Sequence, residues 1–250
     1  INPLANSDKK SALHYMKAYT DAMKKKGIDL YYFIPPDKAS VYTEFLPEGI
    51  SIYDKTRAED FEDYINKHGG LKNAIFAKQE LSSAKERYGD KLYYKQDTHW
   101  NYLGSFFGFK ALMNVAEPTY KNFDIEVDFE YGKVLTQDLA SMMNVRSYFV
   151  DDVPVVGYLQ GKTFERKTIK AKEDVIAITS NPNSAIKKTV LIVGDSFRNA
   201  MIPYFAKVYS KVIAMKRTDY RHGMMTEYDP DIVIFEVLER YIKAIKGFDF

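Results

Sequence analysis

The sequence predicts an α/β fold in which a central, mostly parallel sheet is covered by helices on both faces. Two features predict it. Short, uninterrupted apolar runs such as Thr189–Val193 and Ile232–Val237 are typical of strands buried on both faces of a parallel sheet. These runs also alternate with amphipathic helical patterns, which is typical of strand–helix–strand units. Ligands in such sheets bind beyond the carboxyl ends of the strands, so we expect a functional site in the loops that follow them.

The first half of the chain alternates between helical and strand patterns. Leu13, Met16 and Met23 share one stripe of a helix that ends before Gly27, and Asn101 has the right chemistry to cap a later helix. In chain order we expect a helix at 8–26, a strand at 28–34, helices at 56–68 and 77–88, a strand at 91–95 and a helix from 101 to 116.

The region from about 117 to 184 has a different sequence pattern: short segments in which apolar and polar residues alternate are joined by charged loops. We expect strands there at 124–129, 147–150, 153–159 and 174–179. The last third returns to the α/β pattern, with strands at 189–193, 211–215 and 232–237 and helices at 197–209 and 238–245. The prediction is a single domain over residues 1–250 with a β-rich insertion at about 117–184.

Composition excludes several classes of function. The chain has 36 basic and 34 acidic side chains and a net charge of +2, which argues against a dedicated nucleic-acid binder. Cysteine is absent, so thiol nucleophiles, zinc knuckles and iron–sulfur ligation are excluded. No apolar run approaches the roughly 20 residues that cross a bilayer. The chain begins at Ile1, which is consistent with the loss of an N-terminal signal or anchor segment.

Ser196 is the candidate nucleophile. The apolar strand pattern ends at Val193 and leads directly into Gly194-Asp195-Ser196, with a helical pattern after it. A serine at a strand-to-helix turn has an exposed hydroxyl, and the amides of the turn can stabilise an oxyanion. The alternative is that Asp195 or Ser196 only caps the helix, which is a common use of both residue types. The segment does not match the Gly-x-Ser-x-Gly elbow of other hydrolases.

His99 is the candidate base, because Asp97 lies two residues before it. In an extended chain the two side chains project from the same side, so the carboxylate can hold Nδ1 and leave Nε2 for a nucleophile. The alternative is a turn of Asp97 and Thr98 that opens the helix at Asn101. The other histidines lie in amphipathic helices or, for the last, in a loop that leaves it open as a second candidate: His14, His68 and His222.

Metal and phosphate sites have little support in the sequence. A single His beside a single Asp provides too few ligands for zinc. Asp229-Pro230-Asp231 has the outline of an Asp-x-Asp motif, but its proline and the strand behind it favour a turn. No glycine-rich phosphate loop is present. We therefore expect no metal and no cofactor.

Taken together, these motifs resemble the SGNH-like polysaccharide O-acetyltransferases typified by the alginate O-acetylation proteins. The pattern Asp-x-His-Trp followed about a hundred residues later by Gly-Asp-Ser is the most specific part of the likeness. Four segments carry the resemblance in the expected order: 33–38 with Val41-Tyr42 and Leu46-Pro47, then 93–101, 192–197 and 229–241. The region 117–184 matches weakly.

The resemblance implies an SGNH-hydrolase-like three-layer fold with Ser196 as nucleophile, His99 as base and Asp97 as its acceptor. It further implies that an acetyl group passes through an acetyl-serine to a hydroxyl of a cell-wall or secreted polysaccharide outside the cytoplasm. In this family the donor side is a separate membrane-bound acyltransferase. An anchored or secreted protein, with an N-terminal segment missing from this sequence, is the location that the resemblance implies.

The glycine and asparagine that complete the oxyanion hole of SGNH esterases have no clear counterparts here. An oxyanion hole here therefore needs a second donor besides the backbone N–H of Ser196. The candidates are Arg221, Arg240 and Tyr241, although arginines more often form ion pairs. Aromatic residues make up 15% of the chain and flank the motifs. Because sugars stack on rings, Trp100 and Tyr204 are further candidates for binding a glycan.

Two other functions remain open from the sequence. The same three residues with water as acceptor make a carbohydrate acetylesterase. A scaffold without catalytic activity, which binds polysaccharide or a membrane partner through a tyrosine-rich surface, is the third possibility.

Overall fold

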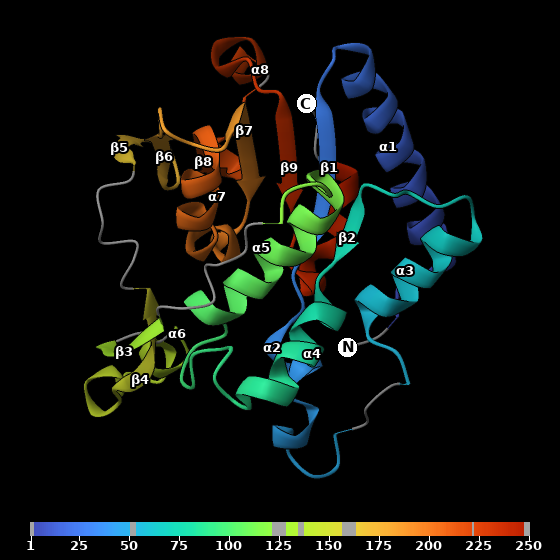
Figure 1. Cartoon of the computed structure of the whole chain (residues 1–250). Helices are drawn as coiled ribbons and strands as arrows, with labels where there is room; N and C mark the ends of the chain where they lie inside the picture. Colours follow the sequence, from blue (N-terminus) through green and yellow to red (C-terminus); the bar gives the residue numbers. More distant parts are fainter. Residues whose placement is uncertain are drawn as a thin grey trace.

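The computed structural model describes residues 3–50, 54–121, 129–134, 138–156, 164–221 and 223–247. Its centre is a seven-stranded sheet of order β2-β1-β9-β7-β8-β6-β5 (Figure 1). The first five strands are parallel to one another, and β6 and β5 are each added by antiparallel pairing to the strand before. The strands are β1 (Asp29–Ile34), β2 (Ala74–Phe76), β5 (Glu165–Lys170), β6 (Val175–Ser180), β7 (Ile186–Gly194), β8 (Tyr209–Lys216) and β9 (Ile232–Glu236). The expected mostly parallel sheet is therefore confirmed.

Helices cover both faces of this sheet. The α-helices are α1 (Asn6–Lys25), α2 (Lys38–Val41), α3 (Arg57–Lys67), α4 (Lys78–Tyr88), α5 (Tyr102–Ala116), α6 (Asp138–Met142), α7 (Ile202–Val208) and α8 (Gly223–Tyr228). Short 3₁₀ helices lie at Thr43–Phe45, Arg146–Tyr148, Ser196–Ala200, Arg217–Asp219 and Glu239–Gly247.

The core consists of two clusters, one on each face of the sheet. Alternate residues of β7 divide between them, with Ile192 in the first cluster and Leu191 and Val193 in the second. The first cluster is completed by α4, α5 and α7, and the second by α1, α3, α8 and the 3₁₀ helix Glu239–Gly247. This is the three-layer α/β/α arrangement that the sequence predicts.

Capping residues explain where two of the expected helices begin. Thr56 and Glu59 form a capping box at the start of α3, in which each side chain bonds the other's backbone N–H. The Asn101 side chain accepts hydrogen bonds from the backbone N–H groups of Leu103 and Gly104, 2.9 and 3.1 Å away, at the start of α5. The expected cap at Asn101 is confirmed.

Two of the expected strands are wrong, and two of the expected helices differ in form from one regular α-helix. Residues 91–95 form no strand, and Tyr93 makes only an isolated antiparallel bridge with Trp100. The segment 147–150 lies partly in the 3₁₀ helix Arg146–Tyr148. The helix expected at 197–209 is divided into the 3₁₀ helix Ser196–Ala200 and the α-helix α7, which has Pro203 in its first turn, where a missing N–H is tolerated. The segment 238–245 is a 3₁₀ helix rather than an α-helix.

The region 117–184 contributes to two separate sheets. Strands β3 (Phe129–Val134) and β4 (Asp151–Val156) form an antiparallel pair, which lies with α6 near one end of α5 (Figure 1). Strands β5 and β6 instead extend the central sheet. Most of the strand expected at 124–129, and the end of that expected at 153–159, lie outside the described residues. The single domain with an insertion stays a prediction.

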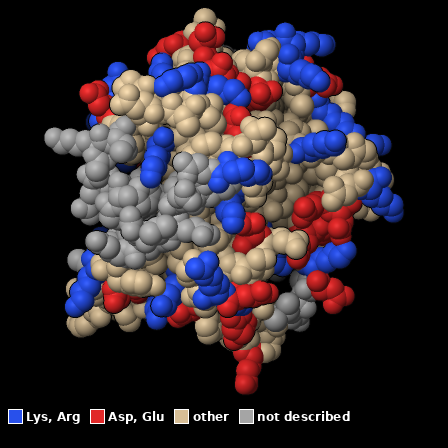
Figure 2. Space-filling model, in the orientation of Figure 1, with Lys and Arg blue, Asp and Glu red and all other residues tan. Residues whose placement is uncertain are grey.

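The surface carries charges of both signs. Figure 2 shows lysine and arginine interspersed with aspartate and glutamate over the face in view, consistent with the balanced composition. Within the described ranges, no helix combines the length and the apolar character that a membrane crossing requires.

Candidate active site

The candidate site lies at the carboxyl edge of the parallel strands. Strand β7 ends at Gly194 and leads into the turn of Ser196, while the neighbouring β9 ends at Glu236. The loop that carries Asp97 and His99 joins them there from the segment between α4 and α5. This is the edge at which the parallel sheet predicted a ligand site.

The turn of Ser196 is held by hydrogen bonds to its backbone and to the preceding Asp195. One oxygen of the Asp195 carboxylate accepts from Phe197 N at 3.0 Å, and the other accepts from Leu238 N at 3.1 Å, just beyond β9. Asp195 N donates to Glu236 Oε2 at 2.7 Å. Asp195 is therefore a cap, as one alternative predicted, yet Ser196 itself remains exposed.

Ser196, His99 and Asp97 form a continuous chain of hydrogen bonds. His99 Nε2 lies 2.6 Å from Ser196 Oγ, and His99 Nδ1 lies 2.6 Å from Asp97 Oδ1. The Asp97 carboxylate is buried, which favours its neutral form, but hydrogen bonds from the His99 side chain, from His99 N and from Asp138 N outweigh burial and lower its pKa to about 2. The carboxylate is thus charged and oriented toward the imidazole at neutral pH.

The loop around His99 is irregular and is held by side chains from distant segments. Lys38 Nζ donates to the carbonyl oxygens of Tyr94, Lys95 and Asp97, at 2.7, 2.8 and 3.3 Å. The Asp138 carboxylate accepts from Thr98 N at 2.8 Å and from the Thr98 hydroxyl, while Asp138 N donates to Asp97 Oδ2 at 3.1 Å. These contacts place the residues on either side of His99.

Trp100 connects the two halves of the site. Its indole Nε1 donates to the backbone oxygen of Phe197 at 2.9 Å, and the Phe197 ring lies between His99 and Trp100, with ring centroids 4.9 and 5.3 Å away. Gly108 of α5 permits this packing, because a Cβ there would lie 2.7 Å from the indole. Trp100 is fully buried, so it supports the site and presents no surface for a sugar to stack on.

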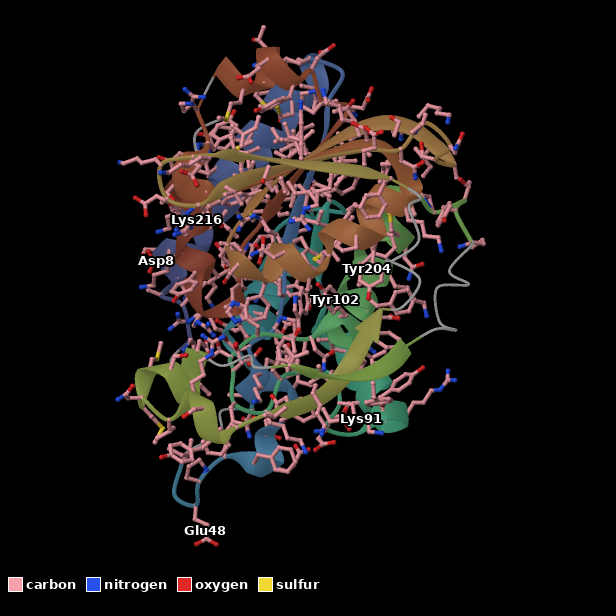
Figure 3. All side chains as sticks on the ribbon, turned by 90° about the vertical axis from the view of Figure 1, so that its left-hand side faces the viewer. Asp8, Glu48, Lys91, Tyr102, Tyr204 and Lys216 are labelled. Atoms are coloured by element: carbon pink, nitrogen blue, oxygen red, sulfur yellow. The ribbon has the colours of Figure 1, made fainter. Side chains whose placement is uncertain are left out.

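The other side chains predicted from the sequence to bind the oxyanion or a glycan have different surroundings. Arg240 forms an ion pair with Asp37, and the half-exposed Tyr241 lines a small cavity together with Gly194 and Asp195. Tyr204 lies in the core beside Tyr102 (Figure 3), and its hydroxyl donates to the Tyr102 carbonyl at 2.7 Å. Arg221 is exposed, and no described contact links it to Ser196.

The other histidines do not enter the described site. His14 lies on α1, and His68 immediately follows α3 and stacks on Tyr64, with ring centroids 4.2 Å apart. His222, the second candidate base, lies outside the described residues.

Among the residues that the structure describes, one cluster has the composition of a metal site, namely Asp97, His99 and Asp138, with potential ligand atoms within 4.8 Å of one another. Their hydrogen bonds to one another and to Thr98 already account for this grouping. The absence of a metal stays a prediction. Asp229 and Asp231 lie in the turn before β9, at the opposite edge of the sheet, and Asp231 Oδ2 accepts from Thr189 N at 2.7 Å.

A larger cavity of about 440 Å³ adjoins the loop of His99. It is lined by apolar and aromatic side chains on one part and by polar and charged ones on the other, the latter being Asp37, Lys38, Thr98 and Arg240. Sequence reasoning did not find Lys38, Asp138 or Glu236. For Lys38 and Glu236, the only signal was their place in the segments 33–38 and 229–241, which carry the family resemblance.

The fold and the site at the carboxyl edge of the parallel strands indicate a class of protein. The three-layer α/β/α domain carries an exposed serine directly after a central parallel strand, with a histidine–aspartate pair hydrogen-bonded to it, and this arrangement fits an SGNH hydrolase-like domain. The sequence profile of the family described as an SGNH hydrolase-like domain, acetyltransferase AlgX, matches residues 2–202. The chain therefore belongs to this acetyltransferase family. A comparison with curated protein sequences gives no match.

Solved structures have the same fold. PatB1 of Bacillus cereus, with a sulfonyl adduct, superposes with a TM-score of 0.71 at 17% identity, over 100% of this chain and 96% of that one. The O-acetyltransferase domain of Pseudomonas putida AlgJ gives 0.58 at 18% identity, over 97% and 87%. AlgX of Pseudomonas aeruginosa gives 0.54 at 14% identity, over 99% of this chain and 60% of that one.

Proposed function

We propose that this protein is an O-acetyltransferase that carries an acetyl group on Ser196 and transfers it to a hydroxyl group of a polysaccharide outside the cytoplasm. The observation that supports this best is the hydrogen-bond chain from the exposed Ser196 through His99 to Asp97. Membership of an acetyltransferase family supports acetyl as the group that is transferred.

In the first half-reaction, Ser196 Oγ attacks the carbonyl carbon of the acetyl donor while His99 Nε2 accepts the hydroxyl proton. The tetrahedral intermediate then breaks its bond to the donor, and His99 returns the proton to the leaving group. The charged Asp97 keeps the proton on Nδ1 and stabilises the imidazolium that exists between the two steps. The product is an acetyl ester of Ser196.

In the second half-reaction a sugar hydroxyl attacks the acetyl ester, and its proton passes to His99 Nε2. The bond between the acetyl carbon and Ser196 Oγ breaks, and His99 returns the proton to Oγ. The acetylated sugar leaves and the starting state of all three residues is restored.

Both half-reactions develop negative charge on the acetyl oxygen, which needs hydrogen-bond donors about 2.7–3.1 Å away. We propose the backbone N–H of Ser196 as one donor. Of the side chains predicted from the sequence, Tyr241 fits best as a second donor, because it is half-exposed and lines a cavity with Gly194 and Asp195. Arg240 fits less well, since its guanidinium is paired with Asp37.

The cavity of about 440 Å³ beside Thr98 is our proposed position for the acceptor sugar. Phe45 is exposed at its edge and offers a ring on which a sugar can stack, while the buried Tyr42 supports it from below, with ring centroids 5.9 Å apart. We also propose that a separate membrane-bound acyltransferase supplies the acetyl group, and that the protein is anchored or secreted through a segment N-terminal to this sequence.

Two measurements test the proposal. A sulfonyl fluoride should modify Ser196 in the wild type, and mass spectrometry of the peptides should find no adduct in Ser196→Ala. With an artificial acetyl ester as donor, addition of an oligosaccharide should then yield acetylated sugar. Release of free acetate alone, at the same rate with and without oligosaccharide, would identify an esterase. Absence of the adduct from the wild type would contradict serine catalysis and favour the scaffold.

A further inference from the structure

Glu236, the last residue of β9, carries a carboxyl group that is buried directly beneath the turn of Ser196. Only 1% of the residue is exposed. Oε2 accepts a hydrogen bond from Asp195 N at 2.7 Å, and Oε1 has no hydrogen-bond partner. A charged carboxylate with one unsatisfied oxygen is very costly in a buried position. No step of the reaction described above uses this group.

The chain approaches Glu236 unusually closely at Gly194. A Cβ on Gly194 would lie 2.2 Å from Glu236 Oε2 and 2.7 Å from Glu236 Cβ, so only glycine fits. The Glu236 side chain therefore occupies the space at the end of β7 from which the turn departs. Asp195 is bonded on the same side, because its carboxylate accepts from Leu238 N two residues beyond Glu236.

We propose that Glu236 is a positioning residue for Ser196: its carboxyl group, kept uncharged beneath the turn, holds the backbone of Asp195 and so sets the direction of Ser196 Oγ toward His99. The inference rests on the proposed function, since it takes Ser196 as the nucleophile. Removing the side chain leaves Asp195 N without its acceptor and opens a space into which the turn can relax.

The surroundings of Glu236 favour the uncharged form. Burial raises the pKa of the Glu236 carboxyl well above its usual range, and the adjacent Asp195 carboxyl raises it further. Arg198 lowers it, but that guanidinium is shared with Asp174 and with the Asp195 carbonyl oxygen. From the other elements, Lys216 (Figure 3), Arg217 and Tyr241 line a cavity of about 200 Å³ that Glu236 also borders.

An uncharged Glu236 also suits the chemistry of the site. Negative charge develops on the acetyl oxygen next to Ser196, and a carboxylate beneath the same turn would oppose it. A neutral carboxyl group holds the backbone through its oxygen without adding that charge. Ionisation of Glu236 at alkaline pH would leave its hydrogen bond from Asp195 N in place but would put a second negative charge beside Asp195 and beneath the developing oxyanion.

Three variants test this inference. Glu236→Gln mimics the neutral acid, because its amide oxygen can accept from Asp195 N, and its kcat with an artificial acetyl ester should stay within about threefold of the wild type. Glu236→Ala removes the acceptor and should lower kcat by about tenfold or more, with KM little changed. The matched control is Glu239→Gln, an equally buried glutamate that accepts from Asp37 N and Ala58 N instead.

Two readouts separate positioning from simple loss of stability. The wild type and Glu239→Gln should both lose activity at alkaline pH as Glu236 ionises, and Glu236→Gln should lose less. Infrared spectra at neutral pH should contain the carbonyl band of a protonated carboxylic acid in the wild type and in Glu239→Gln, and lack it in Glu236→Gln.

A folded Glu236→Gln variant that is tenfold slower than the wild type would overturn the inference, as would a wild-type spectrum without the carboxylic acid band. If Glu236→Ala does not fold, Glu236→Gln decides alone. Failure of the proposed function looks different, because the wild type itself would then show no sulfonyl adduct at Ser196.

Discussion

The two halves of the site are built in different ways, although one hydrogen bond joins them. Ser196 follows β7, a strand between β8 and β9 whose last residues are buried, and its turn is bonded to the end of β9. His99 lies in a loop with one isolated bridge, and side chains from other segments, Lys38 and Asp138 among them, hold that loop in place.

This difference has a physical consequence. Strand pairing positions the serine through many backbone hydrogen bonds and close packing, which single substitutions away from the turn cannot remove. The histidine loop depends on a few bonds to charged side chains, so single substitutions far away in the sequence should displace it. We therefore expect close packing to limit substitutions on the serine side, and distant polar contacts to limit them on the histidine side.

The largest expected effect treats both halves equally. Ser196→Ala and His99→Ala should each lower kcat/KM for acetyl transfer by about a thousandfold or more, because nucleophile and base act as one unit. The measurement is the initial rate with an artificial acetyl ester. His68→Ala serves as the control, since His68 stacks on Tyr64 far from this loop in the sequence. A His99→Ala enzyme with one tenth of the wild-type rate would contradict the assigned base.

The second effect belongs to the serine side alone. Gly194→Ala should destabilise the protein by about 1–3 kcal/mol, because its new Cβ would overlap the Glu236 side chain. Denaturant unfolding measures this change. Gly223→Ala is the matched control, since a Cβ there meets no atom within 4 Å. Equal stability of the two variants would mean that the packing beneath the serine turn is not tight.

The third effect belongs to the histidine side and depends on pH. The pKa of Asp97 is lowered to about 2, so its contribution to the free energy of unfolding is present above the unfolded-state value near 4 and is lost as the pH falls through 2. The wild type should lose about 2 kcal/mol of stability over that range relative to Asp97→Asn. Denaturant unfolding at several pH values measures this loss. Parallel stability curves would contradict the charged pair.

The chemistry of the site was predictable from local sequence, and its support was not. Ser196 follows an apolar strand, and Asp97 lies two residues before His99, so each motif is visible within a few residues. Asp138 is 41 residues from Asp97, and Glu236 is 41 residues from Asp195. Only the folded chain brings such pairs together. Asp138 lies in the region that matches the family weakly, and Glu236 lies in a matching segment whose pattern does not show what its side chain contacts.

The secondary structure predicted from the sequence differs from the observed one for a similar reason, because local patterns do not show long-range contacts. Residues 91–95 have the aromatic content of a strand, but they pair with no strand: apart from the short bridge to residues 99–101, their backbone N–H groups bond a turn and side chains. The apolar pattern after Ser196 suits one long helix, yet a new helix begins at Ile202 with Pro203 in its first turn. In both places the backbone conformation differs from the one that the local sequence pattern favours, and both segments lie beside the residues of the candidate site.

The smallest expected effect concerns the hydrogen bonds by which Asp138, distant in the sequence, holds the loop of His99. Asp138→Ala should lower kcat/KM by about tenfold, because Thr98 N loses a charged acceptor worth about 1.4 kcal/mol and the His99 loop can shift. Asp138→Asn retains an acceptor for that N–H and should recover most of the loss. Asp152→Ala, an exposed carboxylate in the same region, is the control and should leave the rate unchanged. If Asp138→Ala keeps the wild-type rate, the loop is held well enough by Lys38 and Trp100, and the histidine side is as robust as the sheet.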